Sequence, residues 1–498
     1  MAQEGEDKKN KKNPYEFLMP RMEGALLEKD PSMYAALVDK GVAGFILFGG
    51  RLEAVKAGIA ELQKRARLPL VIASDLERGL GQQVEGGTLL PSAMAMGSAY
   101  RAGIGEEALR RAFSGLAAQA RWAGINMIFA PVLDINSNPD NPIISTRAFG
   151  EDAQTVSELG AMMAGEIEKQ GVWACGKHYP GHGDTTEDSH SAMPVVNKTA
   201  RALEEFELKP FRAAIGAGVS AIMTGHLKVP LIDPSGLPAT LSAPAIGYLR
   251  HQMGFKGLIV TDALNMAGTG MKEEEAAVLA LEACANILLH PLDPDRTAAY
   301  LVEHAALWRA AHPASDRADA GLLRAKRKRL FSLLASPSLP QAPPDFEGDR
   351  ELARQIALKA IRAEGELFAS GGPKTGGFTV VALSDNPRAL LPFTSALGEL
   401  SPGTKVIVNP QAGPAISRGK GGLIVAVHSI PEAWKPPAAA LKENIERFSA
   451  LGPQVIWLSF GNPYIIPRGR DRLFLLTYSD TPDIQREMAK RIAAGRLA

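Results

Sequence analysis

Short runs of β-branched and other apolar residues alternate with longer stretches of helical periodicity over the first two thirds of the chain. Between the runs, for example over residues 106–123 and 155–170, apolar residues recur at three- and four-residue spacing. This alternation indicates βαβ units and a parallel sheet. The runs expected to be strands are residues 17–19, 43–48, 70–75, 126–135, 174–179, 221–227, 257–264 and 286–290. Eight such units in roughly 320 residues predict an α/β fold with a (β/α)8 TIM-type barrel, over residues 15–335.

Charged and polar side chains stand where most of these expected strands end. The carboxyl ends of barrel strands converge on one mouth, where active sites are built. Their shared position therefore predicts a polar functional site at the barrel mouth. The residues are Asp75, Asp134, Lys177, His178, His226 and Asp262.

The last third of the chain is organised differently. Residues 336–349 are rich in proline and lack periodicity, which predicts an extended linker. A helix is expected over residues 350–368, and residues 350–498 are predicted to form a smaller α/β sandwich domain. The expected strands of this domain are 378–383, 405–408, 423–427, 455–460 and 473–477. With neither a G-x-G-x-x-G after the first strand nor a P-loop, no nucleotide site is predicted there.

Composition argues against several kinds of partner. Lys and Arg total 55 and Asp and Glu total 54, so the formal charge is +1. Such a balanced chain has no global field for a polyanion, and nucleic acid is not expected as a partner. No apolar run approaches the ~20 residues of a membrane span. The two cysteines, Cys175 and Cys284, exclude a disulfide framework and are expected to be small buried hydrophobic residues.

The compartment stays open. Residues 1–14 are polar and are expected to form a disordered lead. No apolar segment follows their basic residues, so the printed chain shows no signal peptide and fits a cytoplasmic protein. A mature chain whose signal peptide had been removed would instead be periplasmic or secreted.

The stretch GKHYPGHGDTTEDSH, residues 176–190, holds three of the nine histidines of the chain. One interpretation is a metal site made by His178, His182 and His190. Their spacing matches no common zinc signature such as H-E-x-x-H, so no metal is expected. The favoured interpretation is that Lys177 and His178 hold a polar substrate while Asp188 and His190 form an acid/base pair. The carboxylate would fix the tautomer of the imidazole and raise its pKa.

Three other places carry candidate residues. Asp262 ends the very apolar strand of IVTDALNM, where it can cap the next helix or act as a nucleophile or charge stabiliser. Arg147 lies in the long irregular loop 136–150, a position where an isolated Arg is most often a surface ion-pair residue. Asp75 leaves its strand in SDLERGLG, residues 74–81, and an Asp and an Arg at a barrel mouth can bind vicinal hydroxyls with bidentate geometry.

These motifs together resemble glycoside hydrolase family 3, in particular its NagZ-like branch of β-N-acetylglucosaminidases. GKHYPGHGDTTEDSH is similar to the K-H-F-P-G-H-G…D-S-H signature of that branch, and IVTDALNM is similar to the strand that carries the nucleophile. NMIFAPVLDI, STRAFGED and IMTGHL match further family stretches in the expected order. The resemblance spans residues 15–334, and the region after the linker resembles the C-terminal α/β domain of two-domain members.

The resemblance implies residue roles. Asp262 corresponds to the family nucleophile, and His190 with Asp188 corresponds to the loop-borne acid/base dyad. The residues that correspond to contacts with sugar hydroxyls are Asp75, Arg147, Lys177 and His178. His182 and His226 also match family positions, as sugar contacts or as scaffold.

The resemblance also implies an activity. The expected reaction is retaining hydrolysis of terminal β-linked N-acetylglucosamine through a covalent glycosyl-Asp intermediate, with no metal or organic cofactor. The expected substrates are N-acetylglucosaminides, a class that includes fragments of peptidoglycan. Two departures concern substrate preference: Tyr179 replaces a Phe, and SDLERGLGQQVEGG replaces D-Q-E-G-G-x-V-x-R. The downstream Arg of that pattern has no clear counterpart, and Arg78 is the candidate to replace it.

Several alternatives remain at this level. A neutral His beside the acceptor site would let phosphate approach, so an N-acetylglucosaminide phosphorylase is one of them. A β-glucosidase on the same scaffold is another. A non-catalytic carbohydrate-binding barrel and a metallohydrolase belong to different classes, and product analysis or metal analysis separates them.

Overall fold

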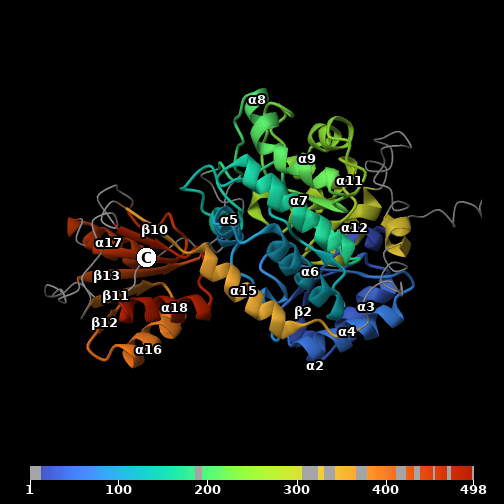
Figure 1. Ribbon diagram of the computed structural model, residues 1–498. Helices are drawn as coiled ribbons and strands as arrows, with labels where there is room; N and C mark the ends of the chain where they lie inside the picture. The colour runs from blue at the N-terminus through green and yellow to red at the C-terminus, as the bar shows by residue number, and fades with distance from the viewer. Residues whose placement is uncertain are drawn as a thin grey trace, which may run out of the picture. The chain divides into compact units, whose positions relative to one another are not determined.

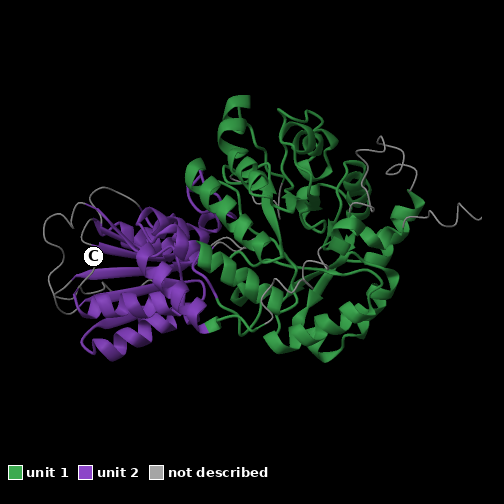
Figure 2. Cartoon of the chain, turned by 45° about the vertical axis from the view of Figure 1, so that its right-hand side comes forward, with its two compact units in different colours: residues 1–88, 110–135, 152–346 green, residues 89–109, 136–151, 347–498 purple. Residues whose placement is uncertain are grey.

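The computed structural model divides into two compact units, which are described separately (Figures 1 and 2). Unit 1 comprises residues 1–88, 110–135 and 152–346, and unit 2 comprises residues 89–109, 136–151 and 347–498. The described residues are 13–185, 193–304, 323–329, 342–365, 378–410, 422–430, 438–452, 455–467 and 473–495. No helix in these ranges is long and apolar enough to cross a membrane.

Parallel strands form the centre of unit 1. Seven of them are hydrogen-bonded in chain order: β2 (Arg21–Glu23), β3 (Gly44–Phe48), β4 (Val71–Ser74), β5 (Met127–Ile128), β6 (Trp173–Tyr179), β7 (Ala221–Thr224) and β8 (Leu258–Thr261). A parallel bridge from Val260 to Ile287 links β8 to the start of β9 (Leu288–Leu289). β9 in turn pairs in parallel with β1 (Leu18–Met19), which directly precedes β2. These pairings join the two edges of the sheet and confirm the barrel that the alternating pattern predicts.

Helices surround these strands (Figure 1). Those that lie within unit 1 are α2 (Gly24–Lys29), α3 (Ser32–Lys40), α4 (Leu52–Arg65), α7 (Ala153–Lys169), α8 (Ala200–Ala202), α9 (Lys209–Gly216), α10 (Ala243–Gly247), α11 (Glu273–Glu282) and α12 (Pro294–Glu303). Residues 323–329 are also helical, and α6 (Glu106–Trp122) starts in unit 2 and continues into unit 1. The apolar face of α4, for example, buries Val55, Ile59 and Leu62.

The strands are buried on both faces, as in parallel sheets that are covered by helices. Alternate strand residues form one cluster that fills the barrel, with Val71 and Ala73 from β4 and Leu258 and Val260 from β8 among its members. Cys175 belongs to this cluster, as predicted, whereas Cys284 is only partly buried. The strands are shorter than predicted because their polar ends leave the hydrogen-bonded ladder and enter the loops at the mouth.

Unit 2 is built on a second α/β sheet. Its strands, in spatial order, are β10 (Arg362–Glu364), β15 (Leu473–Leu476), β14 (Val455–Gly461), β13 (Leu423–Ser429), β11 (Thr379–Ser384) and β12 (Lys405–Val408). All pairs are parallel except the one between β10 and β15. Figure 1 shows α16 (Leu391–Leu400) and α18 (Pro482–Ala493) side by side on one face and α17 (Ala439–Ser449) on the other.

The start of unit 2 departs from the sequence-based expectation. The helix expected over residues 350–368 is α15 (Phe346–Ala360), which begins earlier and is followed directly by β10. Arg362 and Glu364 pair with Leu476 and Phe474 of β15, a partner that local periodicity does not reveal. The linker boundaries of 336 and 349 stay a prediction, since residues 336–341 lie outside the described ranges.

Unit 2 also includes two segments from early in the chain. The helix α5 (Ala93–Arg101) is held there by Ser92 Oγ, which donates to the carbonyl of Tyr478, and by Ser98 Oγ, which donates to the carbonyl of Ala360. Gly97 lies so close to the carbonyl oxygen of Phe149 that a Cβ would stand 1.8 Å from it. The loop 136–151, with Arg147, is thereby part of unit 2.

The closeness of neighbouring barrel strands yields a testable prediction. A Cβ on Gly44 would lie 1.7 Å from the carbonyl oxygen of Val71, so Gly44→Ala must push β3 and β4 apart. We expect a loss of stability of about 3 kcal/mol, seen as a lower thermal unfolding midpoint. Gly165→Ala is the matched control, because Gly165 lies in α7 with open space beside it and should gain about 0.5–1 kcal/mol. Equal midpoints for the two variants would contradict this packing.

Candidate active site

The polar residues that end the barrel strands lie around one mouth of unit 1. Asp75 follows β4, Asp134 lies in the segment after β5, and Lys177 and His178 are in β6. His226 and Asp262 stand just beyond the ends of β7 and β8. Because these five strands are parallel neighbours in one barrel, their carboxyl ends point the same way.

Lys177 is the buried cation of this mouth. Its ammonium nitrogen lies 2.6 Å from Oδ1 of Asp75 and 2.6 Å from Oε1 of Glu77, and its side chain is only 2% exposed. A buried charge needs such partners, since its desolvation is otherwise too costly. The Glu77 side chain is 8% exposed and that of Asp75 is 29% exposed. Asp75 is therefore the carboxylate that a ligand can reach, while Glu77 is the buried partner of the lysine.

Asp134 organises the histidine segment. Its side chain is fully buried and accepts hydrogen bonds from the backbone N–H groups of His178 and His182, the latter at 2.7 Å. Oδ2 also lies 2.7 Å from Nδ1 of His178. Burial acts to raise the pKa of Asp134, but His178 and His182 outweigh it and hold that pKa below its ordinary value. Since an ionised carboxylate can only accept, Nδ1 of His178 is the donor to it, and Nε2 is the ring nitrogen that remains for another partner.

His182 is a neutral histidine. It is 1% exposed, and its Nδ1 lies 2.6 Å from Oγ1 of Thr185. Burial lowers the pKa of His182 to about 4, against the opposing influence of Asp134. A ring with this pKa is uncharged at neutral pH, so it is not the imidazolium that a general acid requires.

Asp262 stands at the end of β8 with a partly exposed side chain. Its backbone N–H donates to the carbonyl of Thr224, and its Oδ1 accepts the N–H of Ala263 at 2.8 Å. His226 is fully buried, and its Nε2 donates to the carbonyl of Ala263 at 3.0 Å. His226 thus fixes the backbone immediately after Asp262. A carboxylate held in this way, next to buried apolar strands, has the position that a nucleophile or charge stabiliser requires.

The described part of unit 1 does not include three of the residues singled out from the sequence. Asp188 and His190 lie outside the described residues, which stop at Thr185 and resume at Met193. Arg147 belongs to unit 2, where its Nη1 donates to the carbonyl of Ile143 at 3.3 Å. The roles assigned to these residues stay predictions, and so does the replacement role of Arg78.

Glu77 was not among the candidates from the sequence, and Asp134 was singled out only as a strand end. The signal for Glu77 is its spacing, two residues after Asp75 in SDLERG, which brings both carboxylates near one strand end. Among the described residues, no group of three or more His, Cys, Asp or Glu side chains is arranged to hold a metal ion.

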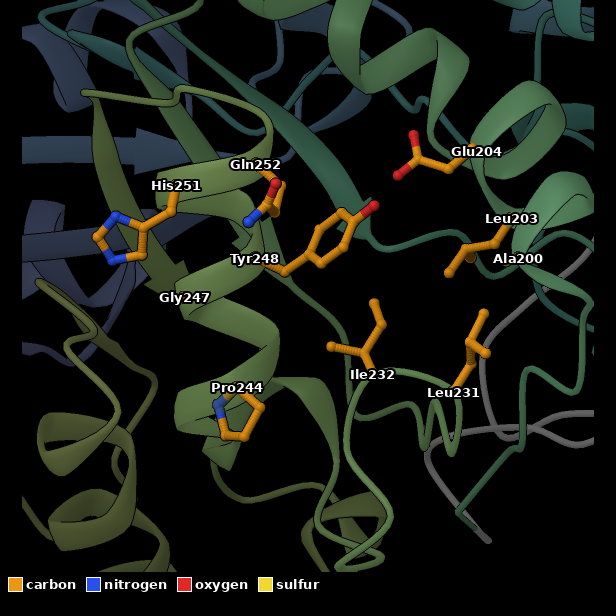
Figure 3. Close-up of a pocket in the computed structure, with 10 residues that line it drawn as sticks. All are labelled: Ala200, Leu203, Glu204, Leu231, Ile232, Pro244, Gly247, Tyr248, His251 and Gln252. Carbon is orange, nitrogen blue, oxygen red and sulfur yellow. The ribbon is translucent and has the colours of Figure 1, made fainter.

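A cavity of about 410 Å³ opens elsewhere in unit 1 (Figure 3). It lies between two π-helical turns, η4 (Leu203–Glu207) and η6 (Tyr248–Gln252), with Leu231 and Ile232 beside it. Figure 3 shows the ring of Tyr248 projecting between these elements towards Glu204. None of the candidate catalytic or substrate-binding residues lines this cavity. The candidate active site is therefore identified from the side chains at the barrel mouth and not from this cavity.

The pKa of His182 yields a pH prediction. The unfolded chain takes up a proton on this histidine near pH 6.5, whereas the folded protein does so only near pH 4. The unfolded state therefore binds more protons between these values, and stability falls as the pH is lowered. His182→Gln lacks this titrating group, so its free energy of unfolding does not fall for this reason. The amount by which it is less stable than the wild type should therefore shrink by about 2 kcal/mol between pH 7 and pH 5.

Denaturant unfolding at both pH values measures this deficit. The exposed His251, changed to Gln, is the control and should show no such narrowing. A deficit of His182→Gln that stays constant with pH would mean that His182 is not held neutral by burial.

Comparison with known proteins identifies a family and several similar proteins. Residues 15–317 match the N-terminal domain of glycosyl hydrolase family 3. The chain is 32% identical over 326 residues to beta-hexosaminidase A of Pseudoalteromonas piscicida, covering 61% of this chain and 54% of that protein, so it spans about half of the relative's length. It is 33% identical over 328 residues to a beta-hexosaminidase of Chromobacterium violaceum, covering 64% of this chain and 88% of that protein.

A solved structure resembles the chain over almost its whole length. It is a family 3 beta-N-acetylglucosaminidase from a Paenibacillus species, with a TM-score of 0.79 and 29% sequence identity. The match covers 98% of this chain and 97% of that protein. The barrel followed by an α/β domain is therefore an arrangement that a known protein of this kind shares.

Proposed function

Because the chain belongs to glycosyl hydrolase family 3, we propose that it is a retaining β-N-acetylhexosaminidase that removes terminal β-linked N-acetylglucosamine. The names of its relatives, beta-hexosaminidase and beta-N-acetylglucosaminidase, support this substrate class. The observation that carries the proposal is the barrel mouth itself. There, the partly exposed carboxylate of Asp262 shares one rim with the buried Lys177, which is paired with Asp75 and Glu77.

The proposed substrate contacts follow from the chemistry of these groups. A sugar ring offers hydroxyls, which need charged or polar partners in a fixed geometry. Asp75, Lys177 and Nε2 of His178 are such partners, and Glu77 and Asp134 hold the last two in place. Arg147 is assigned a further hydroxyl contact by its sequence motif alone. Fragments of peptidoglycan are a natural source of substrates in this class.

The proposed reaction has two steps. Asp262 attacks the anomeric carbon while His190, oriented by Asp188, gives a proton to the leaving oxygen, and a glycosyl-Asp ester forms. His190 then takes a proton from a water molecule as the water oxygen attacks the anomeric carbon, the bond from that carbon to Asp262 breaks, and the sugar leaves with net retention while Asp262 is released as a carboxylate. The depressed pKa of His182 supports assigning proton donation to His190, since His182 is uncharged at neutral pH.

The test compares two chromogenic substrates, 4-nitrophenyl N-acetyl-β-glucosaminide and 4-nitrophenyl β-glucoside. We expect faster turnover of the first, because the relatives are named for substrates that carry the 2-acetamido group. Asp262→Ala should lower kcat by roughly 10⁴ or more, since it removes one member of a covalent mechanism. Asp30→Ala, an exposed acid far along the chain from the motifs, is the control and should leave kcat unchanged.

Product analysis in phosphate buffer completes this test. Free N-acetylglucosamine is the expected product with and without phosphate, whereas a sugar 1-phosphate would identify a phosphorylase. Preference for the glucoside, or a folded Asp262→Ala variant with near wild-type kcat, would overturn the proposal.

A further inference from the structure

Lys198 joins two segments that lie on either side of the proposed acid/base residues in the sequence. Its ammonium nitrogen is 2.7 Å from Oδ2 of Asp184, in the turn that follows β6. Residues 186–192, which include Asp188 and His190, lie between these two partners in the chain. The ion pair therefore connects the described segment that precedes this stretch to the described segment that follows it.

Glu207 is the second carboxylate beside Lys198. Its Oε1 lies 3.7 Å from the ammonium, and its side chain is 1% exposed. Neither of its oxygens accepts a hydrogen bond from any residue that the structure describes. Glu207 ends the π-helical turn η4, a kind of irregularity that is frequent at functional sites.

Glu207 also supports the turn that carries Asp184. Gly181 has a φ of +127°, and a Cβ at this position would lie 2.8 Å from Oε2 of Glu207. The backbone of the turn thus rests directly on the buried carboxylate. One residue later, the N–H of His182 is bound by Asp134.

The returning segment is anchored independently. Val196 N–H donates to the carbonyl of Lys228, and Lys228 N–H donates to the carbonyl of Pro194. Backbone N–H groups of both segments thus donate hydrogen bonds that do not involve Lys198 or Glu207. Lys198 adds an ion pair from the returning segment to Asp184, with Glu207 beside it.

The charges around Glu207 make its ionisation depend on Lys198. Burial raises the pKa of Glu207 to about 7, Lys198 opposes this, and Asp184 and Asp134 add to it. The other acids of its own turn, Glu204 and Glu205, are paired with Arg212 and Arg201. Below this pKa Glu207 is neutral, and Lys198 is left to Asp184 alone.

We propose that Glu207 is a positioning residue for proton transfer. Its buried carboxylate holds Lys198 and supports the Gly181 turn, and so fixes the two ends of the stretch that carries Asp188 and His190. This inference rests on the proposed function, in which His190 protonates the leaving group. Glu207 itself touches no reacting atom in this account.

The test uses the full-length chain with Glu207→Gln, Lys198→Met and the double variant. One substrate is 2,4-dinitrophenyl N-acetyl-β-glucosaminide, whose leaving group departs with little protonation. The other is N,N′-diacetylchitobiose, whose sugar leaving group needs the proton. Glu204→Gln, on the same turn but paired with Arg212, is the matched control.

We expect kcat/KM on the disaccharide to fall about tenfold or more in each single variant, and by less than about threefold on the dinitrophenyl substrate. The double variant should be no worse than either single one, because both changes break one coupled unit. The acid limb of the disaccharide pH profile should move to lower pH in Glu207→Gln, since the group that titrates near 7 is gone.

Equal losses on the two substrates, additive losses in the double variant, or an unmoved acid limb would each overturn the inference. If Glu207→Gln does not fold, Lys198→Met carries the same comparison, because its side chain is 23% exposed and tolerates change better. A wild-type enzyme that hydrolyses neither substrate would refute the proposed function, and the inference with it. An active wild type with indiscriminate losses in the variants would refute the inference alone.

Discussion

The buried charge of Lys177 is the constraint on which the barrel mouth depends. An ammonium group inside a barrel is tolerated only with carboxylates around it, and Asp75 and Glu77 supply them from the loop after β4. This ion triad spans from β4 to β6, across the end of β5. Asp134 comes from that intervening segment and binds the two backbone N–H groups and the imidazole of the histidine stretch. Two groups of contacts, the Lys177 triad and the hydrogen bonds of Asp134, therefore stabilise the adjacent residues Lys177 and His178.

Neighbouring titratable groups at this site differ in protonation state. Asp134 stays ionised because two histidines surround it, and His182 stays neutral because it is buried. Glu207, which lies beside Gly181 of the same turn, has a pKa of about 7, since Lys198 only partly offsets its burial. Such separation of pKa values by environment is what acid/base chemistry needs from a site built of similar side chains.

The position of the strand-end residues at one mouth could be predicted from the sequence, for a geometric reason. Parallel strands in a barrel bring their carboxyl ends together whatever the loops do, so Asp75, Lys177 and Asp262 could be assigned to one mouth from the strand pattern. The partners of these residues could not. That Glu77 pairs with Lys177, 100 residues later, depends on side-chain reach across strands, which no periodicity encodes. The end of α15 at Ala360 was also missed, because the pairing of β10 with the distant β15 overrides local helix preference.

The central claim is that Asp262 forms a covalent bond to the sugar at this mouth. An activated 5-fluoro N-acetylglucosaminide tests it most directly, because the fluorine slows breakdown of a glycosyl-enzyme and lets it accumulate. Mass spectrometry of the digested protein should then find the sugar on the peptide that contains Asp262, and no adduct in Asp262→Ala. An adduct on a different residue, or turnover of the reagent without any adduct, would contradict the account.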